Sequence, residues 1–218
     1  MRLIHCLAVV AAAGLVVSSA SGEIAYNNFG AGNDGFDYNW GLGWSVAGEN
    51  NSVQFGVEQA FAFTSGMSGE LSDIYVPIWY APITSEPDSV TVHIASYSGA
   101  TAPTTGDILE SWTVDITDDW SGWAPPHQLT SAGGVMLDEG ARYWIWMEAA
   151  NDVTWAGWGM NPDPGYTLEH TLRREGEDWL DISQSTAGAL RVDVIPAPGS
   201  TALLAIGVGA VARRRRRD

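Results

Sequence analysis

The segments SVTVHIASY, residues 89–97, and ILESWTVDI, residues 108–116, decide the fold. Apolar side chains occupy every second position in both of them: Val90, Val92 and Ile94, then Trp112, Val114 and Ile116. Alternation with a period of two is typical of a half-buried β-strand with one face towards water. The residues between them, 98–107 (SGATAPTTGD), are mostly turn formers. Two strands joined by a loop are therefore predicted.

The same organisation continues from residue 23 to residue 195. In GALRVDVI, residues 188–195, alternation predicts that Leu190, Val192 and Val194 face the core, and that Arg191 and Asp193 face water. Other short β-rich runs are separated by clusters of turn formers, and no stretch has a long helical apolar face. The sequence therefore predicts an all-β fold, an antiparallel and jelly-roll-like β-sandwich over residues 23–195.

Two strand faces carry the main ambiguity. In RYWIWME, residues 142–148, Tyr143, Ile145 and Met147 alternate with Trp144 and Trp146. Either set can face the core, so one aromatic set can be at the surface. His93 falls on the polar face of its strand and is expected to be a surface histidine.

Both ends of the chain differ from this body. Residues 1–22 are typical of a secretory signal peptide, with Arg2, the apolar run Cys6–Val17 and the small residues SSASG. Residues 196–218 contain PAPG and then thirteen small or apolar residues, 200–212. As a helix this run is roughly 20 Å long at ~1.5 Å per residue, which is short for a hydrocarbon core of ~30 Å.

This expected short hydrophobic helix is followed by five arginines: Arg213, Arg214, Arg215, Arg216 and Arg217. The positive-inside rule predicts that they stay in the cytoplasm and act as a cytoplasmic stop to export of the chain. The helix then holds the protein in the inner membrane transiently, until the chain is cut near the proline motif. A permanent membrane anchor is the alternative interpretation.

The body is strongly acidic and lacks cysteine. The chain has 26 acidic residues against ten arginines and no lysine, and six of those arginines lie in the two terminal segments. The body therefore carries a net charge of about −21, which repels phosphate backbones and argues against a nucleic-acid partner. Because the one cysteine is Cys6, the mature body has neither disulfides nor thiolate ligands.

The tail, with VIPAPGS at residues 194–200, resembles a PEP-CTERM sorting signal. The motif residues are Pro196, Ala197, Pro198 and Gly199, with Ala197 where the commonest form has glutamate. This resemblance implies removal of the signal peptide by signal peptidase and processing of the tail by an exosortase-type enzyme. Delivery to the cell surface or an extracellular matrix would follow.

The body resembles the exported choice-of-anchor domains, most closely type R. The resemblance is carried by YNNFGAGNDGFDYNWGLGWSV (26–46), QAFAFTSGMSGELSDIYVPI (59–78), ILESWTV (108–114), LDEGARYWIWMEAANDVTWAGWGMN (137–161) and GALRVDV (188–194). It implies export and surface delivery, and no established catalytic residues.

Eleven tryptophans suggest a second activity, the binding of polysaccharide by stacking. Trp120 and Trp123 are the candidates for stacking on sugar rings, because they lie among Asp118, Asp119 and Gly122 in an expected loop. The alternative is that most of the tryptophans fill the core between the sheets.

Acidic loop residues offer two candidate calcium sites, since carboxylate and carbonyl oxygens suit this cation: Asn33, Asp34 and Asp37, and separately Asp118 and Asp119. Neither matches an EF-hand loop, and solvated turn residues are the alternative interpretation. No other cofactor is predicted.

Catalysis has little support in the sequence. His93, His127 and His170 are far apart, and the chain has no HExxH, GxSxG or phosphate-loop motif. We therefore expect a non-enzymatic, exported structural or adhesive protein. A carbohydrate-active enzyme using a carboxylate pair and a permanently membrane-anchored scaffold are the alternatives.

Overall fold

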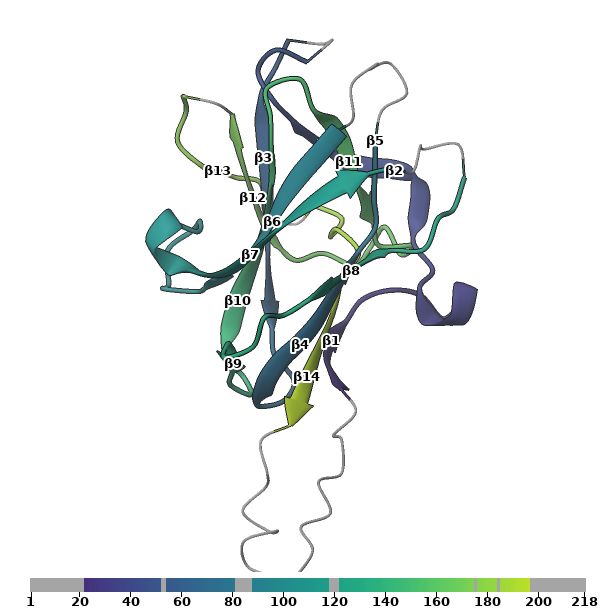
Figure 1. Ribbon diagram of the computed structural model, residues 1–218, viewed down its shortest axis with the longest axis vertical. Helices are drawn as coiled ribbons and strands as arrows, with labels where there is room; N and C mark the ends of the chain where they lie inside the picture. The colour runs from purple at the N-terminus through teal and green to yellow at the C-terminus, as the bar shows by residue number, and fades with distance from the viewer. Residues whose placement is uncertain are drawn as a thin grey trace, which may run out of the picture.

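The computed structural model describes residues 22–51, 54–80, 88–117, 122–174, 176–183 and 185–196. Two antiparallel sheets lie against each other (Figure 1). The smaller sheet has the order β1 (Glu23–Asn27), β14 (Arg191–Pro196), β4 (Gly69–Val76) and β8 (His127–Thr130), with β9 (Met136–Leu137) also pairing with β4.

The larger sheet has the order β5 (Ile78–Tyr80), β11 (Trp155–Met160), β2 (Asn39–Ala47), β3 (Val57–Thr64), β10 (Arg142–Ala149), β6 (Asp88–Ser96) and β7 (Ile108–Ile116). β12 (Glu169–Arg174) pairs with β3, and β13 (Leu180–Asp181) pairs with β12. The described helical segments are two short 3-10 turns, Asn33–Gly35 and Thr105–Asp107. The predicted all-β antiparallel sandwich is confirmed, and the expected C-terminal helix lies outside the described residues.

The core fills the space between the sheets. Phe61, Val92 and Ile145 of the larger sheet and Ile74 and Val192 of the smaller one are completely buried in a single apolar cluster. The core-facing residues predicted for β6 and β14 are confirmed, since these residues are all buried: Val90, Val92, Ile94, Leu190, Val192 and Val194. Burial of this apolar area is the main force holding the sheets together.

Asp193 does not face water, contrary to the sequence-based expectation. Only 4% of the residue is exposed, because β14 lies inside the smaller sheet and its outer face is covered. The guanidinium of Arg191 donates to both carboxylate oxygens of Asp193 over 2.7 Å, and lies over the rings of Phe36 and Tyr75. The ion pair satisfies a carboxylate that would otherwise be costly to bury.

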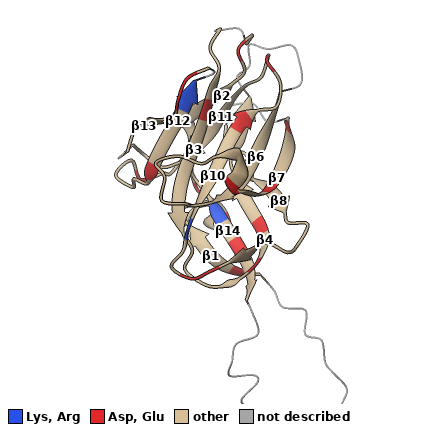
Figure 2. Cartoon of the chain, turned by 90° about the vertical axis from the view of Figure 1, so that its left-hand side faces the viewer, with Lys and Arg blue, Asp and Glu red and all other residues tan. Residues whose placement is uncertain are grey.

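The described body begins and ends at the same end of the sandwich. β1 and β14 are neighbours, with Glu23 opposite Val194, and Pro196 still pairs with Gly69 of β4 (Figure 1). The turns from β2 to β3 and from β10 to β11 lie at the opposite end. Acidic residues are spread over the strands and loops, and basic residues are few (Figure 2).

Candidate functional site

The outer face of the larger sheet carries a second apolar layer. Trp144 and Trp146 of β10 are 1% and 2% exposed, and lie among Ala60, Ala62 and Ala95 of the flanking strands. These three alanines are small enough to let the indoles lie between the neighbouring strands. Both faces of β10 are therefore buried, and neither aromatic set of RYWIWME is at the surface.

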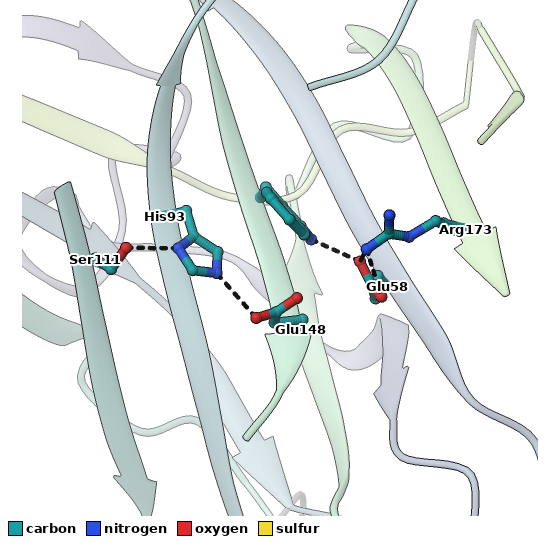
Figure 3. Close-up of polar contacts among 6 residues, drawn as sticks. Glu58, His93, Ser111, Glu148 and Arg173 are labelled. Carbon is teal, nitrogen blue, oxygen red and sulfur yellow. Dashed lines mark hydrogen bonds and ion pairs between the residues drawn. The ribbon is translucent and has the colours of Figure 1, made fainter. Parts of the chain in front are cut away.

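Polar side chains cover Trp146 from the side of β12. Its Nε1 donates to Oε2 of Glu58 over 2.9 Å, and a guanidinium nitrogen of Arg173 donates to both carboxylate oxygens of Glu58 over 2.9 and 2.7 Å (Figure 3). The Arg173 guanidinium also lies 5.0 Å from the ring centre of Trp179, which contacts Trp146 edge-on. Burial raises the pKa of Glu58, although the charge and hydrogen bonds of Arg173 oppose this rise.

A chain of three polar residues covers Trp146 from the side of β7. Nδ1 of His93 lies 2.7 Å from Oγ of Ser111, and Nε2 lies 3.2 Å from Oε1 of Glu148 (Figure 3). The imidazole lies 4.6 Å from the ring of Trp146 and His93 is 6% exposed. The expectation of a surface histidine is therefore wrong, because the side chain lies between aromatic and polar neighbours on a covered sheet face.

The order Ser111, His93, Glu148 is that of a nucleophile, a base and an orienting carboxylate.

Glu58 and Glu148 also line one groove of about 470 Å³ near the β10–β11 turn, together with Arg173 and Asp152. Their carboxylates are held by Arg173, Trp146 and His93. As drawn in Figure 3, these contacts tie the strands of the outer face to one another.

A second groove, of about 230 Å³, lies on the outer face of β2 and β11 beside β5. Its wall is formed by Trp79, Trp155 and Leu42. The indole of Trp79 lies across glycines of two strands: a Cβ atom at Gly43 or Gly157 would lie 2.4 or 2.7 Å from its ring atoms. Such approaches are too close for any side chain, so only glycine allows the indole to lie flat there.

The sequence analysis missed this groove. The alternating glycines of TWAGWGM, residues 154–160, were the signal, because they leave one face of a strand without side chains. That signal becomes specific only when β11 is paired with β2, where Gly159 lies opposite Gly43 and Gly157 opposite Ser45.

The structure describes one of the two predicted stacking tryptophans. Trp123 is 38% exposed, in agreement with its expected place in a loop. Its Nε1 donates to the carbonyl oxygen of Phe36 over 3.2 Å, and its ring lies 6.5 Å from that of Tyr38. Trp120 lies outside the described residues.

The first candidate calcium site forms a tight turn. Asn33 Nδ2 donates to Oδ1 of Asp37 over 3.2 Å, and Asn33 and Asp34 have φ angles of 50° and 57°. Within the described ranges, no three His, Cys, Asp or Glu side chains are grouped so that they could hold a metal ion. Asp118 and Asp119, the second candidate, lie outside these ranges.

The candidate sorting residues are described only at their start. Pro196 closes β14, whereas Ala197, Pro198, Gly199 and the arginines 213–217 lie outside the described residues. In the part of the chain that is described, no helix has the length and apolar character needed to span a membrane.

No protein-family model matches the chain, and no curated protein sequence matches it.

Proposed function

We propose that the chain is an exported, non-enzymatic surface protein whose β-sandwich is delivered to the cell surface or an extracellular matrix by a cleavable C-terminal sorting signal. The observation that carries the proposal is the three-part tail, residues 196–218, behind a signal-like N-terminus. The PAPG motif begins at Pro196, where β14 ends, so an exosortase-type enzyme would cut beside a folded domain.

The proposed role of the sandwich is structural or adhesive, in contact with extracellular polysaccharide. A choice-of-anchor-like body, an acidic surface that keeps an exported protein soluble, and aromatic side chains at the surface support this role. Trp40 and Trp123 are 44% and 38% exposed, and such rings can stack on sugars.

Mass spectrometry of the mature protein isolated from its own cells tests the sorting proposal. We expect a C-terminus within residues 196–199 and an N-terminus close to residue 23. Substitution of Pro196 and Pro198 by alanine should leave the tail attached, whereas the same change at Pro103 should not affect processing. Mature protein that ends in RRRRRD would refute the sorting signal and support a permanently anchored scaffold.

A carbohydrate-active enzyme is the second candidate, and the groove shared by Glu58 and Glu148 is the observation that favours it. Two carboxylates, one with a raised pKa, are the usual apparatus of glycoside hydrolysis. Release of reducing ends from a polysaccharide by the purified protein, abolished by Glu148→Gln and retained by Glu177→Gln, would establish this activity in place of the non-enzymatic role.

A further inference from the structure

We infer that the groove between Trp79, Trp155 and Leu42 is a binding site for an uncharged sugar ring of a polysaccharide. This inference rests on the proposed adhesive role and gives it a site and a ligand class. The groove lies on β2, β5 and β11, and its lining does not include Trp123, the described one of the two stacking residues predicted from the sequence.

The shape of the groove suits a flat, amphipathic ring. The indole of Trp79 lies flat on Gly43 and Gly157, and Trp155 and Leu42 line the groove next to it. A pyranose presents faces of C–H groups that stack on an indole. The volume of about 230 Å³ lies below the usual range for drug-sized ligands and is consistent with one sugar ring of a longer chain.

Polar groups in the groove are left for a ligand. Trp79 is only 7% exposed, yet its Nε1 has no hydrogen-bond partner among the described residues. The indole nitrogens of Trp44, Trp112 and Trp158 donate to carbonyl oxygens, whereas those of Trp144 and Trp155, like that of Trp79, have no partner in the described part of the chain. Of these three, Trp79 and Trp155 line the groove. A buried donor without a partner is costly unless a ligand or water accepts its hydrogen bond.

This donor lies over the backbone of a glycine that lines the groove. Nε1 of Trp79 is 2.8 Å from the place that a Cβ of Gly157 would occupy. Among the described side chains, the polar atom that is both sealed from solvent and unpaired is Oγ of Ser72, so Trp79 Nε1 remains accessible. The Ser45 hydroxyl, also in the groove and without a partner in the described part, adds a second group that can bond a sugar hydroxyl.

The charge of the groove selects among sugars. Its eight lining residues carry no ionisable side chain: Gly41, Leu42, Gly43, Ser45, Trp79, Trp155, Ala156 and Gly157. The surrounding body is strongly acidic, which disfavours uronic-acid or sulfated polymers. A cationic sugar would find no carboxylate in the groove to pair with. A neutral hexose polymer is therefore the ligand class that fits.

Isothermal titration calorimetry of the purified full-length chain tests the inference. The probes are cellohexaose and mannohexaose as neutral hexose chains, with a galacturonic-acid hexamer as their anionic counterpart. We expect binding of at least one neutral probe and at least tenfold weaker binding of the anionic one. Trp155→Ala and Leu42→Asp should each raise the Kd of the neutral probe at least tenfold. Phe55 is an exposed aromatic residue that does not line the groove, so Phe55→Ala should leave this Kd within twofold.

The outcomes separate the groove from the wider adhesive role. Leu42 is 58% exposed, so Leu42→Asp reports on the groove even where Trp155→Ala disturbs the fold. Binding that survives both substitutions but is lost in Trp123→Ala overturns the groove and keeps the adhesive role. Tighter binding of the galacturonic-acid hexamer, or no binding of either neutral chain, overturns the inference, and neither result affects the test of the sorting signal.

Discussion

At the scale of single residues, His170 is the most unusual titratable group. Its ring is completely buried, stacked on Phe61 at 3.9 Å and edge-on to Trp44 at 4.3 Å. Gln59 Oε1 lies 2.8 Å from Nε2, and Ser185 Oγ lies beside Nδ1. This hydrogen bonding fits a neutral imidazole, and burial lowers the pKa of His170 to about 3.

The lowered pKa predicts a specific sensitivity to acid. Below pH ~6.5 the unfolded chain binds a proton that the folded chain refuses until about pH 3, so the free energy of unfolding falls as the pH decreases through this window. The loss from this group can reach ~5 kcal/mol. Urea unfolding of His170→Gln should show a smaller fall between pH 6 and 4 than the parent protein. Parallel pH profiles for the two proteins would contradict the assignment.

At the scale of elements, the contact of β12 with β3 depends on the pair of Glu58 and Arg173. Their side chains are 19% and 31% exposed, so the pair is only partly screened by water. In the Arg173→Met variant, Glu58 keeps the hydrogen bond from Trp146 Nε1 and loses the two charge-assisted hydrogen bonds from Arg173. We expect the free energy of unfolding to fall by ~1–3 kcal/mol.

Thermal and urea unfolding test this prediction, with a substitution of the neighbouring Arg174 as the control. Arg174 is exposed and lies next in the same strand, so Arg174→Met should change the stability by less than ~0.5 kcal/mol. The double variant Glu58→Gln, Arg173→Met should recover part of the loss, since it no longer leaves a half-buried carboxylate short of partners. Equal losses in the two single arginine variants would rule out a structural role of the pair.

The sequence predicted the strands whose two faces differ. Alternation is decisive for β6, β7 and β14, because one face of each strand holds branched or aromatic apolar residues and the other mostly polar ones. It failed for His93 and Asp193, and it left the environment of Trp146 open. A layer containing Trp179 and Arg173 covers the outer face of the larger sheet, and Arg191 pairs with Asp193 on the smaller one. Periodicity along one strand carries no information about what later segments of the chain place over it.

The candidate sites are harder to predict from the sequence than the strands, because contacts between distant strands form them. Trp123 was predicted from its local setting alone, since polar neighbours and glycine indicate a loop. The groove of Trp79 requires Gly43 of β2 and Gly157 of β11 to be brought under a residue of β5. Such a site follows from the pairing of three strands, which no single segment of the sequence specifies.

At the scale of the whole molecule, the smaller sheet depends on the last described strand of the chain. Its second strand is β14, and among the described strands β1 pairs only with β14. A chain that lacks residues 190–218 therefore loses the centre of this sheet and the apolar side chains of Leu190, Val192 and Val194. We expect it to be unfolded, whereas a chain ending after Pro196 should fold.

Far-ultraviolet circular dichroism and limited proteolysis compare the two truncated chains. Both lack the apolar run and the arginines, so they differ only in the segment 190–196 and in its contribution to the sheet. A cooperative unfolding transition in the shorter chain would show that β1 and β4 form a stable sheet without β14.

The position of β14 also determines how the body would carry a mechanical load. A pull applied at the C-terminal end of β14 runs along this strand, which lies between β1 and β4 (Figure 1). The hydrogen bonds from β14 to β1 and β4 would then be strained together in shear, instead of opening one after another as in a peeled strand. The strand that leads into the C-terminal segment is thus also the one best placed to resist a pull on that segment.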